Sequence, residues 1–430
     1  MEERFTRLEN AIVRREPARA KIQRVAHHLV RDGMHYEKHY SPRLMSLGPI
    51  HHGAPKLQLG EQFKQMWAAM YIRSTGQAPQ SLHGRVLDNM EEVMKLFATD
   101  LFTTFSNFSD QGFGSMKEMI CWTLFVDACA LLQILENAEL GEAYKMNVKV
   151  EQLNLVVQDV ILLENQLPFP LLKLLWRDTD ESSLIPIMKK FLRYYWDART
   201  EEWEIMRIEP PTHLLDLLRS IMLPESRHPD NRDSIIYFHS KFLGKMLIHR
   251  NIMELKAAGI EVKSSNTPWP GDIRFSLGWL RSKLVLPEIV VNETTAANLL
   301  NLIAYEMCPD FENNYEINDF VSFLDTLINH PDDVKALRSE QIVLNYLGSD
   351  EEVVNLFTTI SYNLAHDMGN YFITRNHIAM HFVHKTLPTW LALGYHTYFS
   401  NPWAIIAFLA AVMGLSLTFI QTWYAIHPPK

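Results

Sequence analysis

The stretch Leu153–Trp176, LNLVVQDVILLENQLPFPLLKLLW, decides how this chain folds. It is apolar enough to resemble a membrane span, but polar and helix-breaking residues interrupt it, among them Asp159, Glu164, Asn165, Gln166, Pro168 and Pro170. Polar groups inside an apolar core must find hydrogen-bond partners. The stretch therefore predicts buried helices around a structural polar network. The alternative is a catalytic Glu164, although no second carboxylate or nucleophile accompanies it at a readable spacing.

Helical signals continue on both sides of this stretch. Apolar residues at three- and four-residue spacing predict seven further helices: Glu61–Ile72, Val86–Phe97, Met116–Glu136, Thr212–Met222, Ser240–Ala258, Thr295–Met307 and Phe320–Ile328. Ser349 and Glu352 form a capping-box pattern before a predicted helix at Val353–Leu364. Gly259 is expected to cap the end of the predicted helix Ser240–Ala258.

Three short β-like pieces follow Gly259: Ile260–Lys263, Ile273–Leu277 and Leu284–Val291. Their composition predicts a small antiparallel sheet. The expected fold class is therefore mainly α, with a large helical domain, one small antiparallel β-sheet and a single C-terminal transmembrane helix.

Changes in composition divide the chain into six predicted parts. They are a charged N-terminal segment (1–20), a helical subdomain (21–223), a polar loop (224–234), a second helical subdomain with the small sheet (235–385), a juxtamembrane segment (386–401) and a transmembrane helix (402–426).

The predicted anchor is Trp403–Ile420, WAIIAFLAAVMGLSLTFI, which contains no ionisable side chain. Aromatic residues flank it in the pattern of membrane interfaces: Tyr398, Phe399, Trp403, Trp423 and Tyr424. Pro402 stands where a helix can begin without losing a needed N–H. Continued to Ile426, the helix is long enough to cross ~30 Å of hydrocarbon. The alternative is a buried core helix, but core helices rarely run this far without a charge.

Charge and cysteine content indicate where the rest of the chain resides. The formal net charge is −9, which argues against a nucleic-acid partner because phosphates require a basic surface. Three scattered cysteines fit a reducing compartment. The first residues, MEERFTRLEN, carry no apolar signal sequence. We therefore expect a single-pass protein with its bulk in the cytosol and the lipid bilayer as one partner. Two glycosylation sequons, at Asn107 and Asn292, would matter only in the opposite orientation.

Known catalytic fingerprints are absent from the sequence, including the phosphate-binding loop, the nucleophile elbow and the zinc-binding H-E-x-x-H. His377, His381 and His384 share one helical face, but no cysteine or carboxylate completes a metal site. The pair His51-His52 lies in a proline-rich loop and predicts a structural role more than a binding one. The sequence thus predicts no catalytic residue, metal or cofactor.

Several motifs in fixed order give the chain a family resemblance. Tyr40–Gly53 reads YSPRLMSLGPIHHG, Asp159–Phe169 reads DVILLENQLPF, and Asn301–Cys308 reads NLIAYEMC. Together with shorter matches, these resemble the plant family called domain of unknown function 247, over about residues 21–425. The positions that match its motifs are Tyr40, Pro42, Gly48, Pro49, His51, His52, Gly53, Glu61, Lys64, Asp159, Glu164, Asn165, Gln166, Pro168, His213, Asp216, Gly259, Asn301, Glu306, Pro402 and Trp403. One departure is Gln341, which stands where glycine is common.

The resemblance implies a plant membrane protein without an established enzyme activity. Some members of the family lie at grass self-incompatibility loci, which implies a possible recognition role. Two hypotheses follow. The first is a membrane-tethered interaction or signalling protein with an unidentified protein partner. The alternative is a membrane-bound enzyme of unrecognised type, for which Glu164 or the pair His51-His52 would line a deep pocket.

Overall fold

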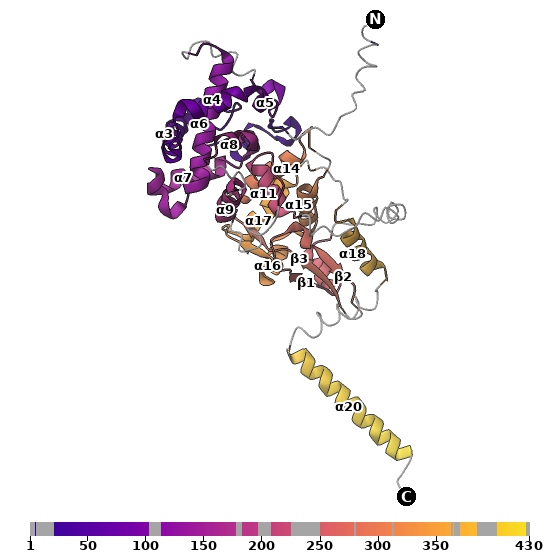
Figure 1. The fold of residues 1–430 in the computed structure, drawn as a ribbon. Helices are drawn as coiled ribbons and strands as arrows, with labels where there is room; N and C mark the ends of the chain where they lie inside the picture. The colour runs from indigo at the N-terminus through magenta and orange to yellow at the C-terminus, as the bar shows by residue number, and fades with distance from the viewer. Residues whose placement is uncertain are drawn as a thin grey trace.

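The computed structural model describes residue 5 and residues 21–102, 113–177, 183–196, 208–224, 250–278, 281–311, 314–362, 364, 370–384 and 402–426. Within these ranges the chain is mainly helical with a small amount of sheet, which confirms the predicted class in its general form. Figure 1 shows an N-terminal lobe in indigo to magenta against a C-terminal lobe in pink to orange. Of the predicted segments 1–20, 224–234 and 386–401, the structure describes only Phe5 and Pro224.

The N-terminal lobe surrounds one apolar helix, α6 (Met116–Asn137), whose side chains are mostly buried. It packs against α3 (Gln58–Thr75), α4, α8 and α9. The remaining helices of this lobe are α2 (Gly33–His39), α4 (Pro79–Asp88), α5 (Met90–Met94), α7 (Val150–Asp159), α8 (Phe169–Leu175), α9 (Leu184–Trp196) and α11 (Leu214–Met222).

The C-terminal lobe packs helices around two small sheets. Its helices are α13 (Ile252–Ala257), α14 (Thr295–Glu306), α15 (Glu316–Leu327), α16 (Pro331–Ser339), α17 (Asp350–Ile360) and α18 (Phe372–His384). The strands are β1 (Ile260–Ser264), β2 (Arg274–Ser276), β3 (Ser282–Leu286), β4 (Ile289–Val291) and β5 (Val343–Asn345). As predicted, Ser349 caps α17 by accepting a bond from the Glu352 N–H at 3.2 Å.

The predicted antiparallel sheet is wrong in topology. Strand β3 pairs in parallel with β1 and antiparallel with β2, while β4 and β5 form a separate parallel pair. The predicted strand Leu284–Val291 divides because Pro287 lacks the N–H that a continuous ladder needs. The chain therefore leaves one sheet at Leu286 and enters another at Ile289.

The predicted helix Val86–Phe97 is also wrong. It divides into the end of α4 and the short α5, with Asn89 between them at φ −103° and ψ 9°. The Asn89 side-chain amide donates to the Arg85 carbonyl at 2.9 Å. Such local side-chain bonds compete with the regular helical ladder. Of the predicted helix Ser240–Ala258, residues 240–249 lie outside the described part, and α13 occupies its end.

Apolar length alone does not identify a membrane span in this protein. Among the described residues, α6 is long and apolar enough, but 83% of its most apolar window is buried in the body. The helical pieces Val150–Asp159 and Leu163–Leu175 are together also long and apolar enough to cross a membrane. They are bent by 103° at the break between Asp159 and Leu163. Both therefore belong to the folded core, as the opening stretch predicts.

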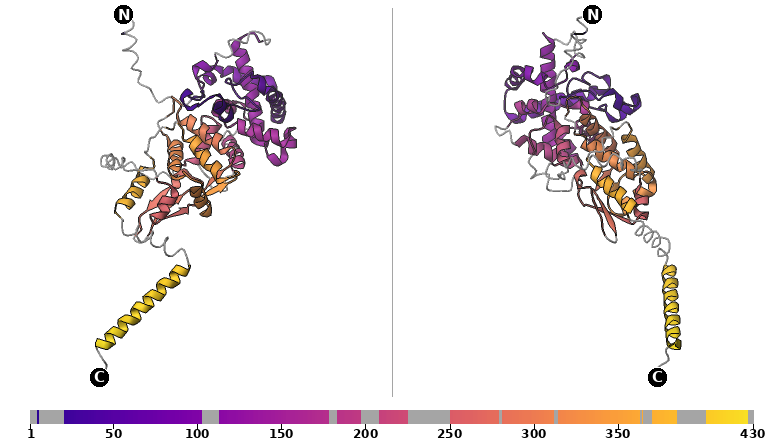
Figure 2. Two further views of the ribbon diagram at one scale, coloured as in Figure 1. Left: turned by 180° about the vertical axis from the view of Figure 1, so that it is seen from behind. Right: turned by 90° about the vertical axis from the view of Figure 1, so that its right-hand side faces the viewer.

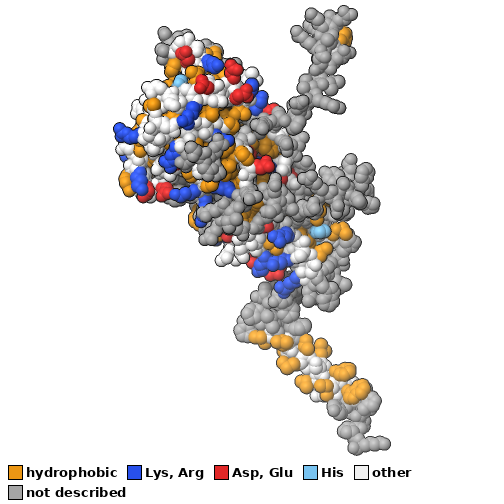
Figure 3. Space-filling model, viewed as in Figure 1, with side chains coloured by type: hydrophobic (Ala, Val, Ile, Leu, Met, Phe, Trp, Pro, Cys, Tyr) orange, Lys and Arg blue, Asp and Glu red, His pale blue; other side chains and the backbone are white. Residues whose placement is uncertain are grey.

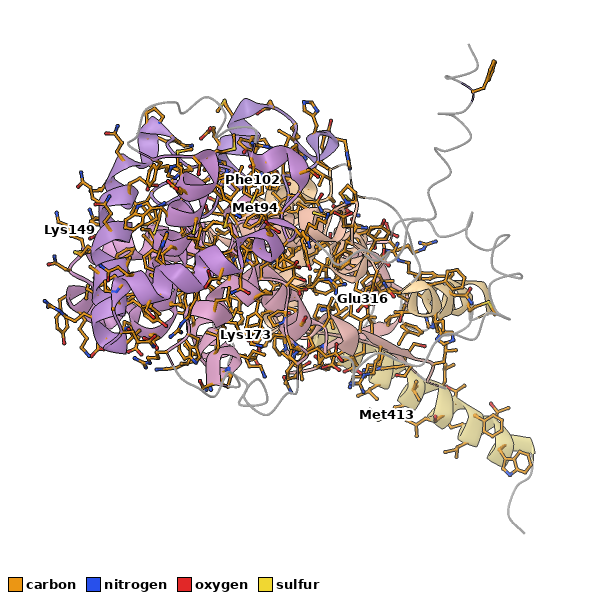
Figure 4. The ribbon with its side chains drawn as sticks, turned by 45° about the horizontal axis from the view of Figure 1, so that its top comes forward. Met94, Phe102, Lys149, Lys173, Glu316 and Met413 are labelled. Atoms are coloured by element: carbon orange, nitrogen blue, oxygen red, sulfur yellow. The ribbon has the colours of Figure 1, made fainter. Side chains whose placement is uncertain are left out.

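The last helix, α20 (Pro402–Ile426), stands apart from both lobes in Figures 1 and 2. Figure 4 likewise places Met413 of α20 outside the body that contains Glu316. The described apolar part of this helix, Leu409–Trp423, is shorter than a full span. Its hydroxyl side chains bond to carbonyls of the helix itself, as Thr418 does to Gly414 at 2.8 Å.

Candidate functional site: a buried polar network

Many polar family-motif residues in the body take part in a buried hydrogen-bond network that reaches from the N-terminal lobe to the C-terminal lobe. Its first part is the Asp159 carboxylate at the end of α7, which is almost fully buried. Asp159 accepts the backbone N–H groups of Arg43, Leu44 and Met45 at 2.9, 2.7 and 2.9 Å. Burial raises the pKa of Asp159, and these bonds oppose that rise. The carboxylate therefore fixes the Tyr40–Gly53 loop, not a ligand.

The side-chain amides of Asn165 and Gln166, in the stretch LLENQLP (162–168), form hydrogen bonds with backbone groups. The Asn165 amide accepts the Leu47 N–H at 2.6 Å and donates to two carbonyls, those of Met45 and Asp159. Gln166 donates to the Val160 and Leu162 carbonyls at 2.8 Å each, and accepts an N–H from α11 at 3.0 Å. These amides replace a helical ladder that the stretch lacks between α7 and α8.

Glu164 binds three groups that lie between residues 25 and 51. Its carboxylate accepts the Val25 N–H at 2.8 Å and the Tyr36 hydroxyl at 2.5 Å, and it lies 3.1 Å from the His51 Nε2. Burial alone would raise the pKa of Glu164, but the bonds from His51, Tyr36 and Val25 outweigh it and lower that pKa. Both carboxylate oxygens are thus occupied, which favours the structural interpretation over a catalytic one.

A buried ion pair supports the same loop from the other side. The Lys64 ammonium lies 2.7 Å from Asp127 and 2.8 Å from Glu61. Burial opposes its charge, but Asp127 and Glu61 outweigh burial and raise the pKa of Lys64. Asp127 also accepts the Gly48 N–H at 2.8 Å. Gly48 has φ +70°, a left-handed conformation that glycine adopts without strain.

The sequence interpretation missed Asp127, although a signal was present. Asp127 is the one Asp, Glu, Lys or Arg side chain between Glu118 and Glu136 in an otherwise mostly apolar helix. A charge in the middle of such a helix must be paired if it is buried. The matching motif lysine, Lys64, is its partner.

The motif residues of the second half connect the two lobes. Asn301 on α14 accepts the Leu163 N–H at 2.8 Å and donates to the His39 carbonyl at 2.8 Å. Glu306, also on α14, accepts from the Arg219 guanidinium on α11 at 2.8 Å. Glu306 further accepts two N–H groups at the start of α15, each at 3.0 Å.

His213 begins α11 as its N-cap. Its Nδ1 accepts the Asp216 N–H at 3.1 Å, and the Asp216 carboxylate accepts the Thr212 N–H at 2.7 Å. The imidazole packs edge-on against Tyr305 with ring centres 4.8 Å apart. Burial lowers the pKa of His213 to about 4, so the ring is neutral at physiological pH.

The other motif positions in the body are buried residues, a histidine and glycines that set the local course of the chain. Tyr40, Pro42, Pro49 and Pro168 are buried, and Pro168 precedes α8 as its N-cap. His52 is half-buried, and burial lowers its pKa. Gly53 and Gly259 adopt φ +75° and +80°, and Gly259 follows α13 as the predicted cap. Pro402 and Trp403 lie away from the network, at the start of α20.

In the histidine row on α18, His381 is bonded to other groups of the fold. His381 is buried, with Nδ1 2.9 Å from the Ser282 hydroxyl and Nε2 2.9 Å from the Ala258 carbonyl. A neutral imidazole satisfies both partners. Among the described residues, no group of three His, Cys, Asp or Glu side chains is placed to hold a metal ion. The side chain of His384 lies outside the described part.

The sequon at Asn292 is part of a helix start. Its side-chain oxygen accepts the N–H groups of Thr294 and Thr295 at 3.0 and 3.1 Å. The other sequon, at Asn107, lies outside the described residues.

Comparison with known proteins places these motifs in a family. A model described as a plant protein of unknown function, domain of unknown function 247, matches residues 22–417. The chain is also similar to UPF0481 protein At3g47200 of Arabidopsis thaliana, with 25% identity over 414 residues that cover 90% of this chain and 83% of that protein. No solved structure matches the chain. Because the family model covers nearly the whole sequence, the protein belongs to the plant family called domain of unknown function 247.

Proposed function

We propose that the protein is held in a membrane by α20 and that its helical body binds another protein at that membrane. The observation that carries the proposal is the run Trp403–Ile420, which forms most of α20 and has no ionisable side chain. A helix of 25 residues extends about 37 Å at ~1.5 Å per residue, enough to cross a bilayer.

The surroundings of α20 support this role. The side chains of Leu415 and Phe419 are 73% and 69% exposed, although apolar groups of this size are usually covered. In a membrane, lipid would cover these two side chains without any contact from the body. Buried helices such as α6 show that the body covers its own apolar helices when they belong to its core.

Protein binding is favoured over catalysis by the state of the motif residues. The carboxylates of Asp159 and Glu164 and the ammonium of Lys64 are each bound to groups of the fold. Such groups hold the body in one shape and leave the outer surface to determine function. A recognition role would use that surface, on a partner chain at the same membrane.

Lysine substitutions along α20 test the anchor. Leu415→Lys near the middle of the helix should cost about 2.5–3.5 kcal/mol of insertion free energy. Gln421→Lys near the end is the control, because lysine there reaches the interface. Alkaline carbonate extraction of membranes should release the Leu415→Lys protein and retain the wild type and the control. Equal release of all three would contradict the anchor.

Affinity purification from mild detergent extracts tests the partner. The full chain should recover a specific protein at a reproducible ratio, and a separately purified preparation of that protein should bind the full chain directly. Recovery of nothing above the background of an unrelated tail-anchored protein would contradict an interaction role.

A further inference from the structure

The three-stranded sheet has one covered face and one open face. Ser282 of β3 lies on the covered face, where its hydroxyl is 2.9 Å from His381 of α18. Alternate residues of a strand point to opposite faces. The register pairs Glu261 with Lys283 and pairs both Lys263 and Arg274 with Val285. Lys283, Lys263 and Arg274 therefore share the open face with Glu261.

Basic side chains gather on this open face. The Arg274 side chain is 70% exposed although it contacts Asp272 at 3.0 Å, and Lys263 is shared between two carboxylates. Arg281 and Lys283 are exposed and form no ion pair with any residue that the structure describes. Figure 3 shows Lys and Arg side chains collected over this sheet.

An apolar side chain accompanies these cations. Leu277, directly after β2, is 55% exposed. Its neighbour Gly278 lies close to Arg281, because an added Cβ would lie 1.9 Å from the Arg281 carbonyl oxygen. Leu277 and Arg281 therefore lie at the same edge of the sheet. We name the set Lys263, Arg274, Leu277, Arg281 and Lys283 the basic sheet face.

The basic sheet face lies at the end of the body nearest α20. Figure 1 and both views in Figure 2 agree on this position. Along the chain, α18 packs against β2 and ends at His384, and α20 begins at Pro402. The protein as a whole carries a net charge of −9, whereas Arg281 and Lys283 at this end have no ion-pair partner among the described residues.

We propose that the basic sheet face contacts anionic phospholipid headgroups of the membrane that holds α20. This inference rests on the proposed anchor. Anionic leaflets attract nearby Lys and Arg side chains over about one Debye length, roughly 8 Å at physiological salt. The same field repels the acidic remainder of the body. The result is a body docked on the bilayer with one orientation, which presents the N-terminal lobe away from the lipid.

The test uses the full chain reconstituted through α20 into nanodiscs of phosphatidylcholine alone or with added phosphatidylserine. A fluorophore is attached at Ser276→Cys, an exposed position on β2; the three native cysteines are buried. Energy transfer to a headgroup-labelled lipid reports how close the sheet is to the bilayer. Transfer should rise with phosphatidylserine and fall again with added salt.

The decisive variant is Arg281→Glu with Lys283→Glu. This variant should show less than about half of the wild-type increase in energy transfer on addition of phosphatidylserine. The control is Lys95→Glu with Lys145→Glu, which changes the net charge equally at two exposed positions of the N-terminal lobe. The control should keep the full rise.

Two results would overturn the inference in distinguishable ways. If the reconstituted chain resists carbonate but transfer is unchanged by phosphatidylserine, or falls equally in both variants, the anchor stands and the docked face is wrong. If the chain is released by carbonate, the anchor fails and the docked face fails with it.

Discussion

At the residue scale, the family motifs explain how a loop without regular structure is held in place. The Tyr40–Gly53 loop donates backbone N–H groups to the side-chain oxygens of Asp159, Asn165 and Asp127. Buried N–H groups without an acceptor are costly, so each of these side chains substitutes for a missing strand or helix. Their spacing in the sequence therefore reflects folding and not a reaction.

Asp159→Asn tests this explanation. The amide presents a donor where the carboxylate accepts backbone N–H groups, so we expect a loss of about 2–4 kcal/mol in the free energy of unfolding. Urea unfolding of the full chain in detergent measures the change. Asp88→Asn, at an exposed position at the end of α4, is the control and should change stability by less than ~0.5 kcal/mol. Equal effects would show that the three bonds to Asp159 contribute little.

The family departure at Gln341 has a structural cost. Gln341 follows α16 with φ +56°, its N–H bonded to the Arg338 carbonyl and the next N–H bonded to the Leu337 carbonyl. This is the helix-ending arrangement in which glycine is preferred. Gln341→Gly should therefore stabilise the protein by about 1 kcal/mol, measured as a higher unfolding midpoint. Gln341→Ala is the control, and a gain of the same size there would contradict the backbone explanation.

His213 makes stability depend on pH. The pKa of His213 is about 4 in the folded protein and 6.5 without the effect of the fold. Between these pH values the unfolded chain therefore binds more protons than the folded protein. The stability contributed by the neutral ring is complete above pH 6.5 and is lost as pH falls toward 4. His213→Asn keeps a side-chain cap for α11 but does not titrate. The variant should lose part of the wild-type slope of stability between pH 6.5 and 4, and an unchanged slope would refute the assignment.

At the element scale, helix type was predictable and the breaks were not. Periodic apolar residues located α3, α6, α11, α14 and α17 because these helices bury one face or nearly all of their surface. The break at Asn89 depends on a bond to Arg85 that spacing does not reveal. The parallel pairing of β1 and β3 depends on distant contacts, because short strands carry no sign of their direction.

The contact of α3 with the motif loop depends on Gly60. An added Cβ there would lie 2.0 Å from the Leu44 carbonyl oxygen and 2.8 Å from the Met45 Cα, both backbone atoms that cannot move freely. Gly60→Ala should destabilise the protein by about 2 kcal/mol or more. Gly84→Ala on α4 is the matched control, because nothing lies within 4 Å of its added Cβ.

The control should act in the opposite direction. Alanine is favoured over glycine inside a helix by about 0.8–1.0 kcal/mol, so Gly84→Ala should raise the unfolding midpoint. Thermal unfolding of both variants gives the comparison. If Gly60→Ala were as stable as Gly84→Ala, the close approach of α3 to the loop would be disproved.

At the scale of the whole molecule, the two lobes share one polar network. Asn301 of the second lobe bonds to Leu163 and to the His39 carbonyl of the first, and Arg219 reaches Glu306 across the same boundary. The sequence indicated that these polar residues belong to motifs, but it did not reveal that the motifs meet. Segments 138 and 262 residues apart in sequence come together only through packing that no local pattern encodes. The predicted division near residues 224–234 stays a prediction.

We propose above all that the folded body lies on the cytosolic side of a membrane and is held there by α20. Protease protection of a chain with an N-terminal tag, in sealed membrane vesicles from plant cells, tests this claim most directly. We predict that protease removes the tag without detergent and leaves a short protected fragment that contains Trp403–Ile420. Protection of the tag until detergent is added, with a glycan at Asn107 or Asn292, would contradict it.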